Sequence, residues 1–153
     1  MGTARYTASG DQTLTTTKTT CLTVGSNAST AQRNEIYECV LGVTGTPADN
    51  TISWTVVRVT ALGTATAQTA APLQDGDRAA QAAAGSNHTV EPTLVANGEV
   101  LKLMPLNARA TFRWVAVPGG EWKHAAIVGV GFAFQASHGS STVDFQAIAA
   151  WQE

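Results

Sequence analysis

TISWTVVRVT, residues 51–60, has the pattern of a β-strand with both of its faces covered by other parts of the protein. Successive side chains of a strand point to opposite faces, and here both sets contain large apolar residues. One face would carry Ile52, Trp54, Val56 and Arg58, and the other Thr55, Val57 and Val59. Strands that are apolar on both faces lie inside layered structures. The segment therefore predicts a core strand of a β-protein.

The rest of the chain repeats this strand pattern at intervals of roughly ten to fifteen residues, which is typical of all-β sandwiches and barrels. Turn-forming Gly, Pro, Asn and Asp separate the segments. Helical periodicity is nearly absent; only the alanine-rich segment 73–87 suggests one or two helical turns. Asn97-Gly98 is a strong hairpin signal. The other predicted strands are 13–24, 35–43, a weak edge strand within 61–72, 88–94, 109–117, 125–134 and 142–151.

These segments predict a single jelly-roll-like antiparallel β-sandwich of about eight strands. A chain of 153 residues fits one domain, and no repeat or linker divides it. Residues 1–12 lack an apolar pattern, so we expect an extended N-terminal arm over 1–12 and the sandwich over 13–153. Gly129 and Gly131 in the predicted strand 125–134 would allow another backbone or a ring to approach closely.

Charge is scarce in this chain. Charged residues make up 13% of the sequence, the formal net charge is −2 and the basic residues are scattered, so we expect no direct nucleic-acid binding. No apolar run is long enough for a membrane span. MGTARYTASG, residues 1–10, is not a secretory signal, so we expect the product to stay in a cytoplasm unless a larger assembly carries it out. A surface so poor in charge suits a protein that partners cover.

The residues that could carry chemistry do not form a recognisable site. His88, His124 and His138 lie far apart, without the spacing that directs two imidazoles at one metal. Cys21 and Cys39 form no metal-binding pair, and we expect them to be buried thiols, with a disulfide between neighbouring strands as the alternative. We therefore predict no catalytic residue, metal ligand or cofactor. A metal site built from separate strands, as in cupin-like enzymes, stays open as an alternative.

LNARATFRWVAVPGGEW, residues 106–122, is the densest stretch of large side chains. Alternation directs Phe112 and Trp114 to one face as core residues and leaves Arg109 and Arg113 on the other. Trp122 and Trp151 lie near the ends of predicted elements, and aromatic rings there are candidates for a protein contact. The arm could add a strand to a partner's sheet edge. The candidate interface residues are Arg5, Tyr6, Arg109, Arg113, Trp122 and Trp151.

Three motifs, over roughly residues 30–150, resemble those of the small jelly-roll virion proteins of tailed bacteriophages, of the capsid decoration (cement) type. The first comprises Pro72, Leu73, Gly76, Asp77 and Ala79; the second His88, Thr89, Glu91, Pro92 and Thr93. The third comprises Pro105, Leu106, Asn107, Arg109, Ala110, Phe112 and Trp114, followed by Pro118, Gly119 and Gly120.

The resemblance implies a structural protein without enzymatic activity. Proteins similar to this one assemble as trimers on the outer surface of the capsid and bridge subunits of the major capsid protein, so the virion, assembled in the host cytoplasm, would be its location. A head-fibre base or a minor tail component is the alternative that the same family suggests. A receptor- or carbohydrate-binding module, with Trp122 or Trp151 as the stacking platform, is a further alternative.

Overall fold

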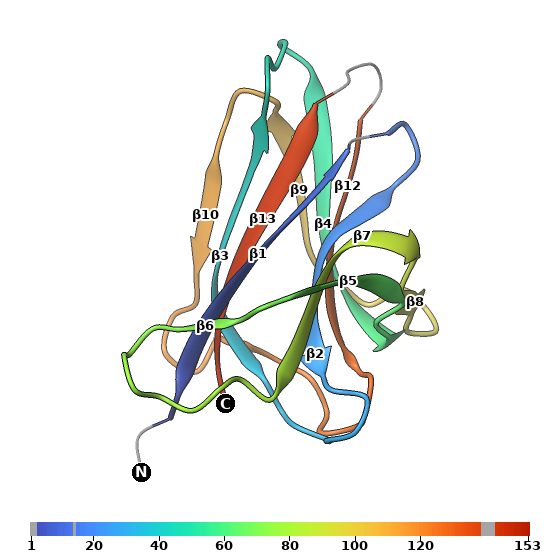
Figure 1. Cartoon of the computed structure of the whole chain (residues 1–153). Coiled ribbons are helices and arrows are strands. Elements are labelled where there is room, and N and C mark those ends of the chain that lie inside the picture. Colours follow the sequence, from blue (N-terminus) through green and yellow to red (C-terminus); the bar gives the residue numbers. More distant parts are fainter. Residues whose placement is uncertain (1–2, 14, 139–142) are drawn as a thin grey trace.

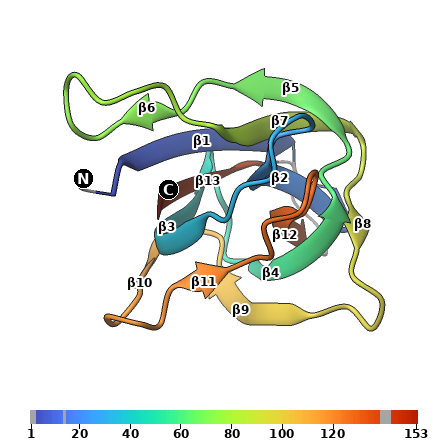
Figure 2. The ribbon, with the colours of Figure 1, turned by 90° about the horizontal axis from the view of Figure 1, so that it is seen from below.

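A computed structural model describes residues 3–13, 15–138 and 143–153, and within them the chain forms two antiparallel sheets that face each other (Figure 1 and Figure 2). Sheet 1 has the order β10-β3-β13-β1-β6, and β11 also pairs with β3. Its strands are β1 (Arg5–Thr13), β3 (Glu35–Thr44), β6 (Ala71–Pro72), β10 (Phe112–Val115), β11 (Trp122–Lys123) and β13 (Asp144–Gln152).

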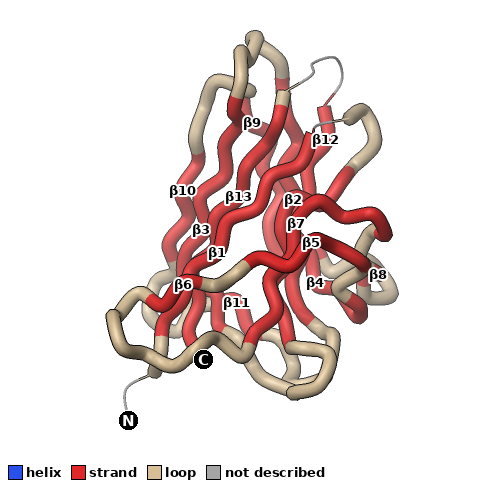
Figure 3. The backbone as a smooth tube through the Cα atoms, in the orientation of Figure 1, coloured by secondary structure: helices blue, strands red, loops and turns tan. Residues whose placement is uncertain are grey.

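Sheet 2 has the order β5-β7-β2-β12-β4-β8, and β9 also pairs with β4. Its strands are β2 (Thr19–Ser26), β4 (Thr51–Ala61), β5 (Thr64–Gln68), β7 (Ala82–Val90), β8 (Thr93–Leu94), β9 (Val100–Asn107) and β12 (Gly131–His138). All described secondary structure is strand, as Figure 3 shows. Accordingly, none of the described segments is a helix that could cross a membrane.

The core lies between the sheets and follows from the alternation of the strands. In β13, Phe145, Ala147, Ala149 and Trp151 are buried, and in β4 so are Ile52, Trp54 and Val56. The Trp54 ring meets the Phe145 ring edge-on, with 5.1 Å between centroids. Each such large side chain contributes about 1.5–3 kcal/mol when it is fully buried. This packing joins the two sheets.

The predicted β-sandwich is confirmed. Eight of the described strands have eight or more residues: β1, β2, β3, β4, β7, β9, β12 and β13. Among these eight, β1 (the first) pairs with β13 (the eighth), and β13 pairs with β3 (the third). Likewise, β2 (the second) pairs with β12 (the seventh), and β12 pairs with β4 (the fourth). Those four pairings also occur in a jelly roll, whereas β7 pairs here with β2 and β9 pairs with β4.

The predicted N-terminal arm is wrong for residues 5–12. Residues 5–13 form β1, which pairs with β13 from Arg5↔Gln152 to Thr13↔Asp144 and with β6 on its other side. Residues 5–12 contain no large apolar residue except Tyr6, because β1 packs closely against sheet 2, where small residues fit. Residues 1–2 of the predicted arm lie outside the described residues, as do residues 14 and 142 of two predicted strands.

Strand β4 is covered on both faces, as its sequence predicts. Ile52, Trp54 and Val56 belong to the main core, whereas Val57 and Val59 form a second buried cluster with Ala133 of β12. The partly buried Leu62, which follows β4, packs against this second cluster. Sheet 2 therefore has a small core of its own on the side away from sheet 1.

Three local predictions were wrong, each because tertiary contacts override local preference. Residues 82–87 of the alanine-rich segment belong to β7 instead of a helix, because Ala84 pairs with Val24 and is buried. Residues 125–130 are a loop; Gly129 has a φ of +75° there, and β12 begins at Gly131. Asn97-Gly98 does form a turn with positive φ, but β8 and β9 beside it both pair with β4.

Candidate interaction surface

Tyr6 and Trp151, two of the predicted interface residues, lie in the core. Both side chains are completely buried, and their ring centroids are 6.1 Å apart on adjacent strands. The prediction was wrong because β13 continues to Gln152, so Trp151 remains in the inward register of Phe145. Tyr6 points inward for the same reason, since β1 is a strand of the sheet. Neither ring is available to a partner in this fold.

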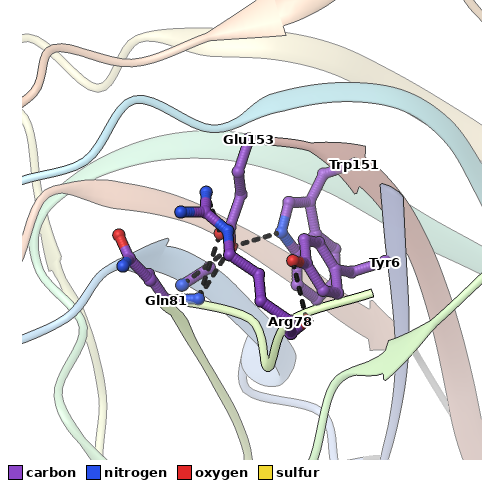
Figure 4. Close-up of polar contacts among 6 residues, drawn as sticks. Tyr6, Arg78, Gln81, Trp151 and Glu153 are labelled. Carbon is purple, nitrogen blue, oxygen red and sulfur yellow. Dashed lines mark hydrogen bonds and ion pairs between the residues drawn. The ribbon is translucent and has the colours of Figure 1, made fainter. Parts of the chain in front are cut away.

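A buried carboxylate holds these two residues and the segment 78–82 together (Figure 4). The side chain of Glu153 is fully buried and accepts hydrogen bonds from the backbone N–H groups of Gln81 and Ala82, at 3.0 Å and 2.8 Å. The indole N–H of Trp151 donates to the same carboxylate at 3.3 Å. The Tyr6 hydroxyl donates to the carbonyl oxygen of Arg78 at 3.0 Å. No sequence pattern signals this cluster, because its members are distant in the chain.

Arg109 and Arg113 are exposed, as predicted, and each has a carboxylate partner within its own chain. The Arg113 Nε atom lies 2.6 Å from Glu38 on the neighbouring strand β3, and this pair raises the pKa of Arg113. Arg109, in the turn before β10, lies 3.5 Å from Asp49 and donates to the Pro47 carbonyl oxygen. Exposed pairs of this kind contribute at most about 1 kcal/mol. They orient the guanidinium groups on the surface.

Trp122 is half-buried at the edge of sheet 1, where it stacks on Trp114. The two indoles are nearly parallel, with 3.7 Å between centroids and 7° between planes. The stack forms because β10 and β11 both pair with β3, which brings the two tryptophans side by side. Trp114 covers one face of the Trp122 ring, so that face is closed to a sugar. The stack packs against the core and leaves part of both rings at the surface.

The outer face of sheet 1 carries the remaining predicted residue, Arg5, and is hollowed next to it. Alternation places Arg5 and Thr7 of β1 outward, and the Arg5 guanidinium lies over the Tyr37 ring, 5.5 Å from its centroid. One hollow of about 220 Å³ is lined by Thr7, Tyr37, Glu38, Val40, Leu73, Ile148 and Ala150. A second, of about 460 Å³, is lined by Thr3, Arg5, Leu73, Gln74, Asp77 and Gln152. Leu73 lines both hollows.

The second family-like motif, residues 88–93, stabilises the outer side of sheet 2. Glu91 accepts hydrogen bonds from the backbone N–H and the hydroxyl of Thr20, and Gln135 donates to that hydroxyl at 3.0 Å. His88 Nε2 lies 3.3 Å from the Thr23 hydroxyl. Burial lowers the pKa of His88, so the ring is neutral at pH 7. These contacts join the motif to β2, so the motif contributes to the stability of the fold.

A hollow of about 660 Å³ lies beside this motif and is lined mostly by small side chains, including Ala65, Ala83, Gly85 and Thr23. Glu91 is its one ionisable lining residue, and it is already bonded to Thr20. Such a surface offers shape and a few hydroxyl groups but no nucleophile paired with a base.

The histidines and cysteines are not brought together. No group of His, Cys, Asp and Glu with metal-binding geometry exists within residues 3–13, 15–138 and 143–153. Burial lowers the pKa of His124, whose Nδ1 lies 2.8 Å from the Ala125 carbonyl oxygen. Cys21 and Cys39 are buried free thiols, as expected. Burial raises the pKa of the Cys39 thiol to about 12 and also raises that of Cys21, so both are poor nucleophiles.

No family model matches the chain, and no curated protein matches it. Among solved structures, it is similar to a chain in the acidic stable capsid structure of Helicobacter pylori bacteriophage KHP30. The match covers 97% of this chain and 87% of that chain, with 10% sequence identity and a TM-score of 0.42. Likeness at this level does not establish a shared function, which has to be inferred from the residues of this chain.

Proposed function

We propose that the chain is a structural protein of a tailed-phage virion, which decorates the capsid and bridges subunits of the major capsid protein as a homotrimer. The observation that carries the proposal is the set of three motifs between Pro72 and Gly120 that resemble those of decoration proteins. The sandwich on which they lie is the architecture that this resemblance implies. Its location would be the outer surface of the capsid, after assembly in the host cytoplasm.

The surface of the sandwich supports a role in binding other proteins. Large aliphatic side chains are exposed in two regions. Those over sheet 1 and its edge are Leu73, Val115, Val117 and Ile148, and those along β8 and β9 are Leu94, Val100 and Leu103. Charged residues make up 13% of the chain, so many copies can lie close together with little mutual repulsion. A protein that binds only the mature capsid lattice stabilises that lattice by linkage. No step of this role requires catalysis.

The test uses the phage that encodes this chain. Capsids from a phage with the gene deleted are mixed with the purified chain and sedimented, and their loss of DNA on heating is followed. We expect the chain to sediment with the capsids, to raise the temperature at which DNA is released, and to have three times the 15.9 kDa chain mass in solution. A chain that stays in the supernatant contradicts the proposal. Localisation to the tail or fibre base by electron microscopy would replace it with the alternative.

A further inference from the structure

We propose that two copies of this chain bind each other through the outer face of sheet 1, with Arg5 of one copy against Asp77 of the other. The proposal deepens the proposed function, since a trimer needs a contact between copies. It starts from the two hollows that meet at Leu73, which we call the Leu73 surface. Its lining residues include Arg5, Leu73, Asp77, Val40 and Ile148.

The charges of the Leu73 surface lack partners within the described part of the chain. Arg5 contacts the Tyr37 ring but forms no ion pair there, although its five N–H donors suit a carboxylate. The carboxylate of Asp77 likewise has no cation or hydrogen-bond donor among the described residues. Arg109 and Arg113 differ from Arg5, because Arg109 is paired with Asp49 and Arg113 with Glu38. The Leu73 surface therefore presents a cation, Arg5, and a carboxylate, Asp77, that no described residue of the same chain pairs with.

The same surface exposes apolar side chains that a partner would cover. Leu73 is 55% exposed and Ile148 is 41% exposed, and Val40 lies beside Ile148 because the two residues are in register on β3 and β13. Apolar side chains with a cation and a carboxylate beside them allow this surface to form a contact between identical subunits that closes into a ring, as a trimer requires. In a ring of three copies, one neighbour supplies a carboxylate for Arg5 and the other neighbour supplies a guanidinium for Asp77. We therefore assign the surface to self-association.

Charge reversal tests the contact in the purified chain alone, by sedimentation equilibrium. We expect Arg5→Glu and Asp77→Arg each to weaken self-association at least about tenfold, because each places like charges opposite one another. The double variant Arg5→Glu/Asp77→Arg should restore association, since the pair is re-formed with its signs exchanged. Circular dichroism and thermal unfolding of each variant establish that the sandwich is intact.

The apolar part of the surface has its own variant and control. Ile148→Asp places a charge in the apolar part of the Leu73 surface and should abolish association. Val100→Asp, at a residue 53% exposed on β9 of sheet 2, makes the same change elsewhere and should leave association unchanged.

Three results would overturn this inference: a monomeric wild-type chain, a double variant no better than the single ones, or equal effects of Ile148→Asp and Val100→Asp. Capsid binding is measured separately. If the chain is monomeric but still binds capsids, the self-contact is wrong and the decoration role holds. If the chain is oligomeric but does not bind capsids, the decoration role is wrong and the self-contact holds.

Discussion

At the scale of single residues, whether an aromatic side chain is buried depends less on its residue type than on whether its polar group has a hydrogen-bond partner in the interior. Trp151 and Trp122 are both tryptophans near strand ends, yet Trp151 is fully buried and Trp122 is half-exposed. Trp151 can be buried because Glu153 accepts its indole N–H. The sequence shows where large aromatic rings occur. It does not show which of these rings will have a hydrogen-bond partner inside the protein. Predictions at single positions were therefore wrong for Tyr6 and Trp151, and right for the exposure of Arg109 and Arg113.

Glu153→Ala should lower the free energy of unfolding by about 2 kcal/mol, because it leaves the N–H groups of Gln81 and Ala82 without their charged acceptor. Urea unfolding followed by tryptophan fluorescence measures the change. The control is Glu99→Ala, which removes an exposed partner of Arg58 and should cost less than about 1 kcal/mol. Equal losses for the two variants would show that the buried carboxylate has no special role.

At the scale of elements, hydrophobic alternation located the strands better than it located their ends. Residues 35–44, 51–61 and 144–152 are strands almost as predicted, since their large apolar residues recur at every second position. The N-terminal strand β1 was missed because Ala8 and Gly10 face the core where Val or Leu would be expected. Small residues at inward positions carry almost no hydrophobic signal. Their strand character comes from pairing with β13.

Deletion of residues 1–12 should unfold the sandwich. It removes most of β1 and the buried Tyr6, and it leaves β13 with an unpaired edge inside the sheet. Loss of a cooperative thermal transition and of dispersed amide signals in NMR spectra would be the expected result. Deletion of residues 1–3, which ends before β1, should leave both in place. A folded protein without residues 1–12 would mean that β1 is dispensable and that the segment behaves as an arm.

At the scale of the whole molecule, the spacing of the two sheets depends on close contacts at glycines. A Cβ atom at Gly10 of sheet 1 would lie 2.5 Å from the Cys21 carbonyl oxygen and 2.9 Å from the Ser86 Cβ in sheet 2. Within sheet 2, a Cβ atom at Gly131 would lie 2.6 Å from the Gly25 Cα, so the close approach expected there is confirmed, whereas the one expected at Gly129 is wrong, because a Cβ atom there would meet nothing within 4 Å. Packed interiors do not absorb such overlaps without shifts of the backbone.

Gly10→Ala should therefore destabilise the protein by about 2 kcal/mol, because the methyl group forces the sheets apart. Gly42→Ala is the matched control: its Cβ atom would meet only Thr111, no closer than 3.4 Å. That change should be neutral or slightly stabilising, since alanine restricts the unfolded chain. Thermal unfolding of the two variants measures the difference. If Gly42→Ala were the more destabilising change, the close contact at Gly10 would not be what sets the spacing of the two sheets.

The sequence by itself determined that this protein is a β-sandwich, because side-chain alternation is local and survives in any arrangement of the strands. Only the tertiary structure decided that β1 lies between β13 and β6, that β8 and β9 both pair with β4, and that Glu153 binds the segment 78–82. The physical reason is that every residue carries the same backbone C=O group and every residue except proline carries the same backbone N–H group. Partners for them are therefore selected by long-range packing, and no local pattern specifies that selection.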